Sequence, residues 1–592
     1  NPAGAYRDGQ AFNDSRNLDF GWDAIVNVRT EVVDSGWTME MAIPWTSLRF
    51  DPTREEQIWG LNLFRRSRWK LEDSFWAPLD RRDRGHRMSK AGTLVGLPTV
   101  KPGRNLALRP FVLSGSGSGR DIAEADRGTT FDGGLDLKYG LSPRLTLDLT
   151  YRTDFSQVEV DREQVNLNRF PLFFPEQRDF FLENSGTFQF GDLAEREYRT
   201  GSSLREFTLF HSRRIGLVRG SPVPIVGGAR LTGSERGFEV GLLDVQTEAF
   251  GDDPPENFSA VRVRRNLGAS DVGFVFANRQ ATDGTARDHY NRSFGVDANI
   301  AMLGNLIVNS YLAHTESPGR DGNSTAARVN VGWRDRLWDA GGFVQQIGED
   351  FNPGLGFVRR TDMRHFYGTV GAHPRPPMAL FLDMNPYVEG HYITNLDGLL
   401  ETRTGTAGLG VAFSEGGTLN LEYTDRFERV ENPFQVGNGG GITAGTYSFR
   451  EASARYTANP ARIFSGGLEL SGGGYFGGTR RSVGANVEWA PSDHFSTQLS
   501  ASHNDLDVQE QSFNADLYSA LFKYAYSTRL YGGLLVQYNA ATEEVVSSMR
   551  LTLIHAPLSN LYLAYTERRD VGDSPAVAER FLTAKLTKYL QF

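Results

Sequence analysis

The sequence predicts an all-β fold: a large transmembrane antiparallel β-barrel preceded by a partial β-sandwich. From about residue 104 onward, successive runs alternate apolar and polar side chains, as β-strands with two different faces do. Charged residues recur on the second face of nearly every run, and no helical pattern is present to cover the first. Short links between runs alternate with longer polar ones. A lipid-facing apolar belt and a polar lumen explain these features together.

Length and composition agree with this fold class. At 592 residues the chain is too long for one ordinary hydrophobic core, and it contains no apolar run long enough to predict a transmembrane helix. The absence of cysteine excludes disulfides, thiolate metal sites and cysteine nucleophiles. A formal charge of −9 argues against nucleic acid as a partner. A mean hydropathy of −0.40 with 12% aromatic residues fits a barrel with a polar lumen better than a soluble enzyme.

Residues 1–100 are expected to form a separate unit, because six of the nine tryptophans lie in the first 76 residues. The alternation over residues 37–43 predicts a half-buried strand that ends at Pro44. Trp37 and Trp59 share the apolar phase of their strands, so we expect both in the core.

This unit, with its RDGQAFND and IPWTSLRF stretches, resembles the family-9-like (DOMON-like) carbohydrate-binding β-sandwich. The module is expected to be incomplete at its N-terminus, since NPAGAYRDG would normally be an internal strand and turn. The resemblance implies that aromatic rings stack on sugar faces. The candidates for this role are the tryptophans that lie off the main alternation, Trp45, Trp69 and Trp76. The alternative is that these three are core residues too.

Residues 104–592 are expected to form the barrel. In residues 145–151, for example, leucines and a tyrosine alternate with Thr146, Asp148 and Thr150. The pattern gives 24 clear strands. Residues 204–216 and 187–191 are weaker candidates, which we include because the short turns on either side of them must open toward the same side of the membrane. We therefore expect about 26 strands, with 24 as the alternative.

Residues 164–191 interrupt the strand pattern. They combine many phenylalanines with Pro171 and Pro175, and two prolines in one stretch argue for an ordered loop over a strand. Because long ordered loops inside compact folds are usually functional, we expect this one to fold into the lumen as a loop or plug. The alternative is an aromatic cluster that only seals the barrel wall. The candidate plug and lumen residues are Phe173, Phe174, Glu176, Arg178, Asp179, Glu183, Arg213 and Arg214.

The last predicted strand ends the chain on an aromatic residue. Leu590 and Phe592 share its apolar phase. A terminal aromatic on an amphipathic strand is similar to the insertion signal that the bacterial barrel-assembly machinery reads. We therefore expect this machinery and the outer-membrane lipid bilayer as partners.

Four stretches together resemble a family of uncharacterised bacterial outer-membrane barrels joined to an N-terminal carbohydrate-binding-like domain. They are FPLFFPEQRDFFLENSGTFQFG (170–191), LFHSRRIG (209–216), GGARLTG (227–233) and DFNPGLGFVRR (350–360). The resemblance implies an outer-membrane location with residues 1–100 in the periplasm, and it brings no established mechanism.

No catalytic motif is found: the sequence contains no G-x-S-x-G, P-loop, H-E-x-x-H or G-x-G-x-x-G pattern. We predict no catalytic residue, cofactor or metal. The first hypothesis is a gated or plugged channel or receptor for glycans or other solutes. The second is a structural, assembly or export component that binds other proteins of an outer-membrane complex, and a glycan hydrolase is a distant third.

Overall fold

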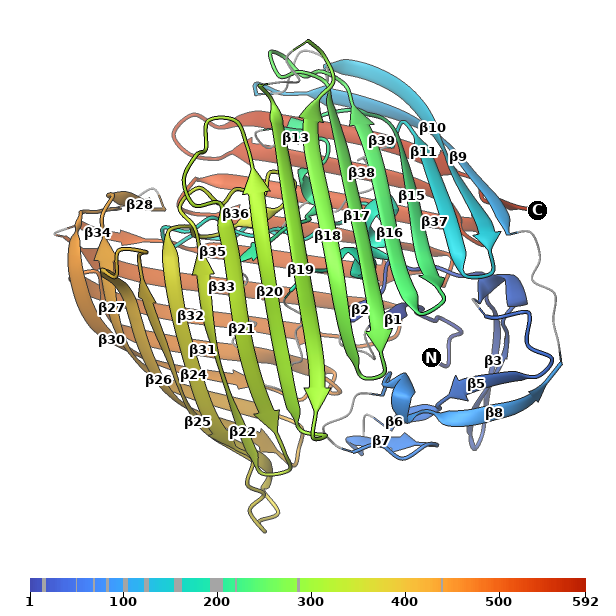
Figure 1. The fold of residues 1–592 in the computed structure, drawn as a ribbon, viewed down its shortest axis with the longest axis horizontal. Helices are drawn as coiled ribbons and strands as arrows, with labels where there is room; N and C mark the ends of the chain where they lie inside the picture. Colours follow the sequence, from blue (N-terminus) through green and yellow to red (C-terminus); the bar gives the residue numbers. More distant parts are fainter. Residues whose placement is uncertain are drawn as a thin grey trace.

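One closed antiparallel sheet contains most of the described chain (Figure 1). The computed structural model describes residues 1–592 except 13–16, 49, 68–69, 81–84, 99–104, 122–126, 154–161, 192–205, 219–220, 285–287, 438–439 and 510. No helix in this described part combines the length and the apolar character that a membrane crossing requires.

The closed sheet consists of strands that follow one another in chain order. They are β9 (Leu106–Ser118), β10 (Gly128–Ser142), β11 (Leu145–Tyr151), β15 (Ile225–Glu235), β16 (Phe238–Thr247), β17 (Glu256–Leu267), β18 (Ser270–Ala281), β19 (Tyr290–Met302), β20 (Leu306–Glu316), β21 (Thr325–Arg334), β22 (Trp338–Ile347), β24 (Met363–Ala372), β25 (Phe381–Thr394), β26 (Leu400–Phe413), β27 (Thr418–Val430), β30 (Gly445–Thr457), β31 (Phe464–Tyr475), β32 (Gly478–Trp489), β33 (Phe495–Val508), β34 (Gln511–Asn514), β35 (Leu517–Ala525), β36 (Leu530–Asn539), β37 (Glu544–Ala556), β38 (Ser559–Asp570), β39 (Ala576–Thr587) and β40 (Leu590–Gln591).

The described residues form 24 barrel strands, because β34 and β35 both pair with β33, and β39 and β40 both pair with β9. The large closed antiparallel β-barrel is thus confirmed, with the lower strand number. The two added candidates lie outside the closed sheet. Residues 185–188 form the short 3-10 helix η4 (Ser185–Phe188). The described part of the other candidate, residues 206–216, forms the short β12 (Phe207–Thr208), which pairs with β23 (Phe357–Val358), and the 3-10 helix η5 (Ser212–Arg214).

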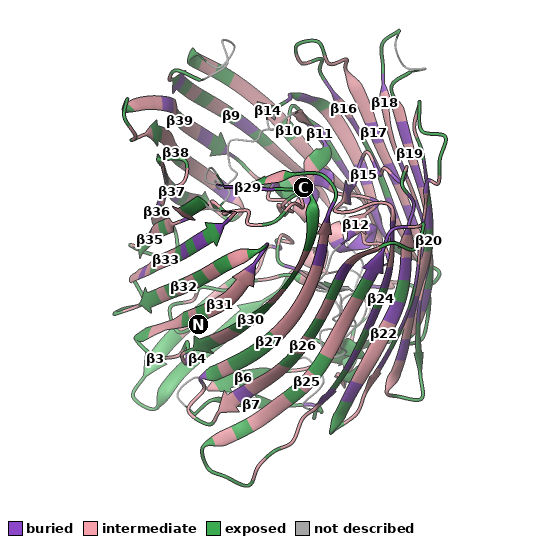
Figure 2. Ribbon diagram, turned by 90° about the vertical axis from the view of Figure 1, so that its left-hand side faces the viewer, coloured by how far each residue is buried: buried purple, intermediate pink, exposed green. Residues whose placement is uncertain are grey.

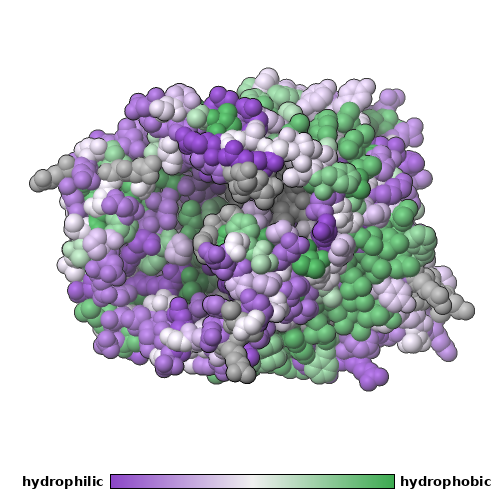
Figure 3. Space-filling model, turned by 90° about the horizontal axis from the view of Figure 1, so that it is seen from above, coloured by the Kyte–Doolittle hydropathy of each residue, from purple (hydrophilic) through white to green (hydrophobic). Residues whose placement is uncertain are grey.

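The two faces of the barrel wall differ as the alternation predicts. On β17, Phe258, Ala260, Arg262 and Arg264 are buried on the inside. Large apolar side chains such as Phe274 on β18 are exposed on the outside. Figure 2 shows this alternation of buried and exposed residues along the strands. Seen from above, the molecule is hollowed near its centre, and hydrophobic residues cover much of one side of its outer surface (Figure 3).

Short turns and long links lie at opposite ends of the barrel. Links such as 236–237 and 268–269 are at the short-turn end, and links such as 248–255 and 348–362 are at the other. Two small hairpins supplement the long links: β13 (Leu217–Val218) with β14 (Ser221–Pro222), and β28 (Phe434–Val436) with β29 (Gly440–Ile442). Because the strand number is even, β9 starts and β39 ends at the short-turn end.

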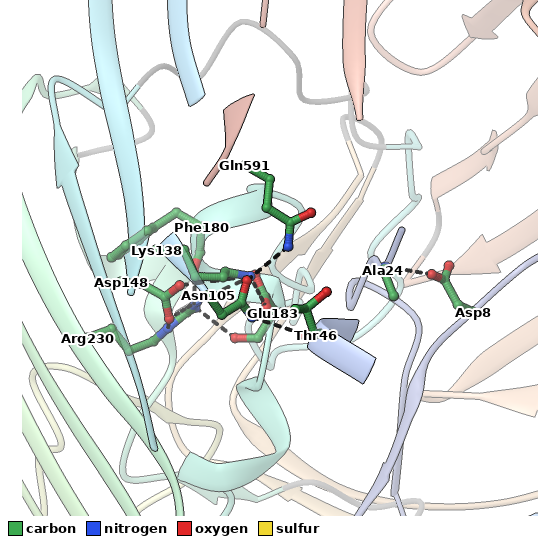
Figure 4. Close-up of polar contacts among 10 residues, drawn as sticks. All are labelled: Asp8, Ala24, Thr46, Asn105, Lys138, Asp148, Phe180, Glu183, Arg230 and Gln591. Carbon is green, nitrogen blue, oxygen red and sulfur yellow. Dashed lines mark hydrogen bonds and ion pairs between the residues drawn. The ribbon is translucent and has the colours of Figure 1, made fainter. Parts of the chain in front are cut away.

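The N-terminal residues lie at this same short-turn end (Figure 1). The Asn105 amide donates to the carbonyl oxygen of Thr46 at 3.0 Å, and Gln591 donates to Asn105 at 3.1 Å (Figure 4). The elements are β1 (Gln10–Phe12), β2 (Asn17–Asp19), β3 (Asn27–Val33), β4 (Gly36–Ala42), η1 (Trp45–Ser47), β5 (Gln57–Leu61), β6 (Phe64–Ser67), β7 (Glu72–Phe75), η2 (Met88–Lys90) and β8 (Gly92–Leu97).

These N-terminal strands pair two by two, as β1–β2, β3–β4, β5–β8 and β6–β7. The described residues therefore show separate hairpins, and the carbohydrate-binding likeness of residues 1–100 stays a prediction. The expectation for Trp37 was wrong: it is 43% exposed, because none of the described strands packs as a second layer on its face of β4.

Candidate functional site

The lumen segment, residues 164–191, runs between two walls of the barrel. At its start, the backbone N–H of Glu163 donates to Gln537 of β36 at 3.1 Å, and Arg169 lies 3.2 Å from the carboxylate of Glu428 on β27. At its end, the backbone N–H of Gly191 donates to Asp297 of β19 at 3.1 Å. The segment therefore contacts lumen-facing side chains on strands that are far apart in the closed sheet.

Aromatic side chains of the lumen segment pack on the inner wall of β15–β18. Phe181 and Phe188 share a buried cluster with Leu243, Val245 and Phe258. Phe173 packs on residues that follow the segment or lie in a distant link, with ring centroids 4.6 Å from His211 and 5.2 Å from Phe357. The ring of Phe174 faces the Arg213 guanidinium at 5.6 Å.

A buried arginine joins the lumen segment to the chain that follows it. Arg178 is almost fully buried and donates to the Glu176 carboxylate at 2.7 Å and to the carbonyl oxygens of Ser212 and Ile215 at 2.6 and 2.7 Å. Burial alone would raise the pKa of Glu176, but the hydrogen bonds and charge of Arg178 outweigh it and hold this pKa below its usual value. Arg213 donates to the Pro175 carbonyl, which adds a further contact between the two stretches.

The short helix α1 (Asp179–Leu182) and its flanks are held to the wall by ion pairs (Figure 4). Arg230 of β15, 3% exposed, lies 2.9 Å from Asp148 of β11 and donates to the Glu183 carbonyl at 2.7 Å. Lys138 of β10 pairs with the Glu183 carboxylate, and Arg109 of β9 lies 3.1 Å from Asp179. Charges removed from water are stable only when paired, so these wall residues favour the docked position of α1.

A second buried pair lies at the end of the lumen segment. Arg262 of β17 contacts both carboxylate oxygens of Asp297, at 2.6 and 2.8 Å, and both side chains are essentially inaccessible to solvent. The same carboxylate accepts the Gly191 N–H, so the wall pair and the segment share one hydrogen-bond network. Gly191 has a φ of +72° and packs on the Tyr311 ring, which leaves no room for a side chain.

The N-terminal residues contact the lumen segment directly. The buried Asp19 carboxylate accepts the Gly21 N–H at 2.8 Å, and Gly21 packs so closely on Leu182 of α1 that an added Cβ would lie 2.6 Å from the Leu182 Cβ. A cavity of about 220 Å³ remains between residues 21–23, α1 and the wall. Asp23 lines this cavity. Its burial and the nearby carboxylates of Asp8 and Asp179 raise the pKa of Asp23 to about 6.

The remaining predicted residues lie apart from this site. Trp45 packs edge-on against Phe50 and Trp59, with ring centroids 5.8 and 5.4 Å away, so its ring is part of an aromatic cluster. Trp76 is exposed, and Trp69 lies outside the described residues. Arg214 donates to the Gly356 carbonyl at 3.0 Å. Leu590 and Phe592 are exposed at the short-turn end, where both contact β9.

Sequence reasoning missed the wall partners of the lumen segment. Lys138, Asp148, Arg230, Arg262 and Asp297 all lie on barrel strands, in the phase that faces the lumen. The available signal was charge: each is a charged residue in the polar phase of an otherwise regular strand. Nothing in that pattern says which opposite charge each one meets.

Comparisons with known proteins found one family model and several solved structures that are similar to this chain. A family model described as a domain of unknown function (DUF5916) matches residues 102–221, which include the lumen segment. No curated protein matches the sequence. Among solved structures, the siderophore receptor PirA from Pseudomonas aeruginosa is similar at 10% identity and a TM-score of 0.34, over 84% of this chain and 83% of that one. PirA from Acinetobacter baumannii is similar at 8% identity and 0.41, over 85% and 83%. OccK1 (OpdK) from Pseudomonas aeruginosa is similar at 8% identity and 0.29, over 82% and 98%.

Proposed function

We propose that this protein is a bacterial outer-membrane channel or receptor that passes or captures glycans or other solutes, and that the lumen segment closes or narrows its passage. The observation that carries the proposal is the course of the segment between two distant walls, with buried ion pairs at its docked end. A barrel this large encloses a wide aqueous space, and an unfilled one would leak. An ordered segment across that space supports a gate or plug.

We further propose that residues 1–100 lie in the periplasm. Outer-membrane barrels place their short turns on the periplasmic side and their long loops outside. The described N-terminal residues lie at the short-turn end, where Gly21 packs on Leu182 of the lumen segment. This position would let a periplasmic event act on the gate.

A second function, as a structural or assembly component, is favoured by one feature of the N-terminal part. Trp37, Met39 and Met41 form an exposed apolar row on β4. Such a row suits contact with another protein. The two functions differ in whether the barrel conducts.

Planar-bilayer recording of the purified protein tests the proposal. Replacement of Pro171–Asn184 by a Gly-Ser bridge should turn a closed or small channel into one of large conductance, and cells that carry it should become sensitive to bulky antibiotics. As a control, residues 250–254 in the link between β16 and β17 are replaced by a Gly-Ser stretch of the same length as the residues removed. This variant should have the conductance of the parent.

Two results would count against the proposal. If the deletion variant inserts normally and conducts like the parent, the lumen segment only packs on the wall. If neither protein conducts at all, the assembly role becomes the better explanation.

A further inference from the structure

A pocket in the lumen wall next to the α1 site has the features of an anion site. Its volume is about 480 Å³, and its wall is formed by β33, β35, β36 and β37 near the short-turn end. Arg162, just before the lumen segment, also lines it. The neighbouring Glu163 is fixed to Gln537 of β36 by a hydrogen bond, which holds Arg162 near this part of the wall.

Two cations that line this pocket, Lys523 and Arg550, lie on either side of strand β36. Lys523 of β35 pairs with Gly533 of β36, and Gly533 pairs with Arg550 of β37. Cross-strand partners face the same side of a sheet, and neighbouring strands are about 4.8 Å apart, so the Lys523 and Arg550 backbones are about 10 Å apart. Between them Gly533 carries no side chain, and the space above it is open except for a backbone carbonyl 3.4 Å away.

The strand phase turns both cations toward the lumen. Thr552, two residues after Arg550 on the same face, is 1% exposed, whereas Leu551 between them is exposed on the lipid side. Thr552 lines the pocket, and its buried hydroxyl has no hydrogen-bond partner among the described residues. Buried polar groups are nearly always paired, so this hydroxyl points to a polar group supplied from outside the chain.

The charge around the pocket is mainly positive. Three cations line it, and the structure gives Arg162 and Lys523 no carboxylate partner among the described residues. The single lining carboxylate, Asp493, is largely exposed and lies 3.9 Å from His494. A concave wall with an excess of one charge attracts solutes of the opposite charge.

We propose that this pocket binds the carboxylate or phosphate group of a small solute between Lys523 and Arg550, with the Thr552 hydroxyl as a further hydrogen-bond donor. The inference rests on the proposed channel or receptor function and names its solutes as anions. Paired cations around a gap suit such a group because charge-assisted hydrogen bonds are the strongest of their kind.

Titration calorimetry on the purified full-length protein in detergent tests this site, with citrate, inorganic phosphate and glucose as separate probes. Citrate or phosphate should bind, and glucose should not. Lys523→Gln and Arg550→Gln should each weaken binding about tenfold or more, because each removes one charge-assisted hydrogen bond. Lys523→Arg should retain it, which separates loss of charge from loss of folding.

The matched control is Arg568→Gln, which removes a cation from the lumen face of β38 outside the pocket. Arg568 pairs with the buried Val546 and so faces the lumen. It should change affinity less than twofold. An equal loss in this control would mean that only the general lumen charge matters and would overturn the site, as would failure of both anions to bind. If the protein conducts but binds no anion, the anion-site proposal is refuted and the channel proposal stands. If it binds anions but does not conduct, the channel proposal is refuted and the anion site stands.

Discussion

Arg230 is the wall residue most directly coupled to the lumen segment, and Arg230→Met is expected to loosen that segment. The guanidinium contacts Asp148 at 2.9 Å and the Glu183 carbonyl at 2.7 Å, and it is almost fully buried. Methionine has similar length but neither the charge nor the donors. In the variant, the buried Asp148 loses this close partner and keeps the more distant Lys138, 3.9 Å away.

The size of the effect follows from the burial of this pair. Removal of one partner from a buried ion pair costs about 3–5 kcal/mol. Lys138 offsets part of that cost, so about 3 kcal/mol is a reasonable value for the docked state. Since about 1.4 kcal/mol corresponds to a factor of ten in an equilibrium, the ratio of undocked to docked segment should rise about 100-fold.

Single-channel recording in planar bilayers measures this ratio as the ratio of open to closed time. The control is Arg455→Met, which breaks the solvent-exposed pair between Arg455 and Glu469. Exposed pairs contribute at most about 1 kcal/mol, so this variant should behave like the parent. If the Arg230→Met protein folds normally and its ratio of open to closed time is unchanged, the pair does not hold the segment.

Three other predictions concern topology, assembly and pH. Protease added to intact cells should leave residues 1–100 uncut, because they lie at the short-turn end; cleavage with an intact outer membrane would reverse the proposed orientation. Deletion of Phe592, or Asp at both Leu590 and Phe592, should leave protein in the periplasm, degraded or aggregated, whereas normal outer-membrane yield would make the terminal aromatic incidental. Asp23 has a pKa raised to about 6 beside Asp8, Asp179, Glu183 and Arg109, so the docked state binds a proton that the detached state releases. Docking of the N-terminal part should therefore strengthen as pH falls through about 6, seen as slower hydrogen exchange over residues 179–188, and Asp23→Asn should abolish that dependence.

The barrel could be predicted from sequence because its physics is local. In such a barrel each strand turns an apolar face to lipid and a polar face to the lumen. The alternation of apolar and polar residues within a single strand, such as β11, therefore reveals both faces. The strand number was overestimated because parity was satisfied with residues 187–191. In the structure that stretch lies outside the closed sheet, with Thr187, Phe188 and Gly191 buried, so it has no alternation between a lipid-facing and a lumen-facing side.

The site could be predicted only in part, because its partners meet across long stretches of sequence. Glu183 and Lys138 are 45 positions apart, and Asp148 and Arg230 are 82 positions apart. Sequence indicated that residues 164–191 are unlike a strand, but the pairing of their charges depends on the strand order and register of the closed barrel. For the same reason the exposure of Trp37 was missed: the strand itself alternates correctly, and only the lack of a covering layer leaves its apolar face open.

The two kinds of contact made by the lumen segment imply a limited opening. Ion pairs hold α1 near the short-turn end, whereas Phe181 and Phe188 are buried in an apolar cluster with the wall. Loss of the ion pairs leaves that cluster intact, and exposure of two buried phenylalanines would cost about 3–6 kcal/mol. Because Phe181 belongs to α1 itself, the segment should loosen at the charged residues Asp179 and Glu183 and stay attached through Phe181 and Phe188. Accordingly, the open events of Arg230→Met should be smaller in conductance than those of the Pro171–Asn184 deletion. Equal conductances would mean that the whole segment leaves the wall together and that the apolar cluster does not hold it.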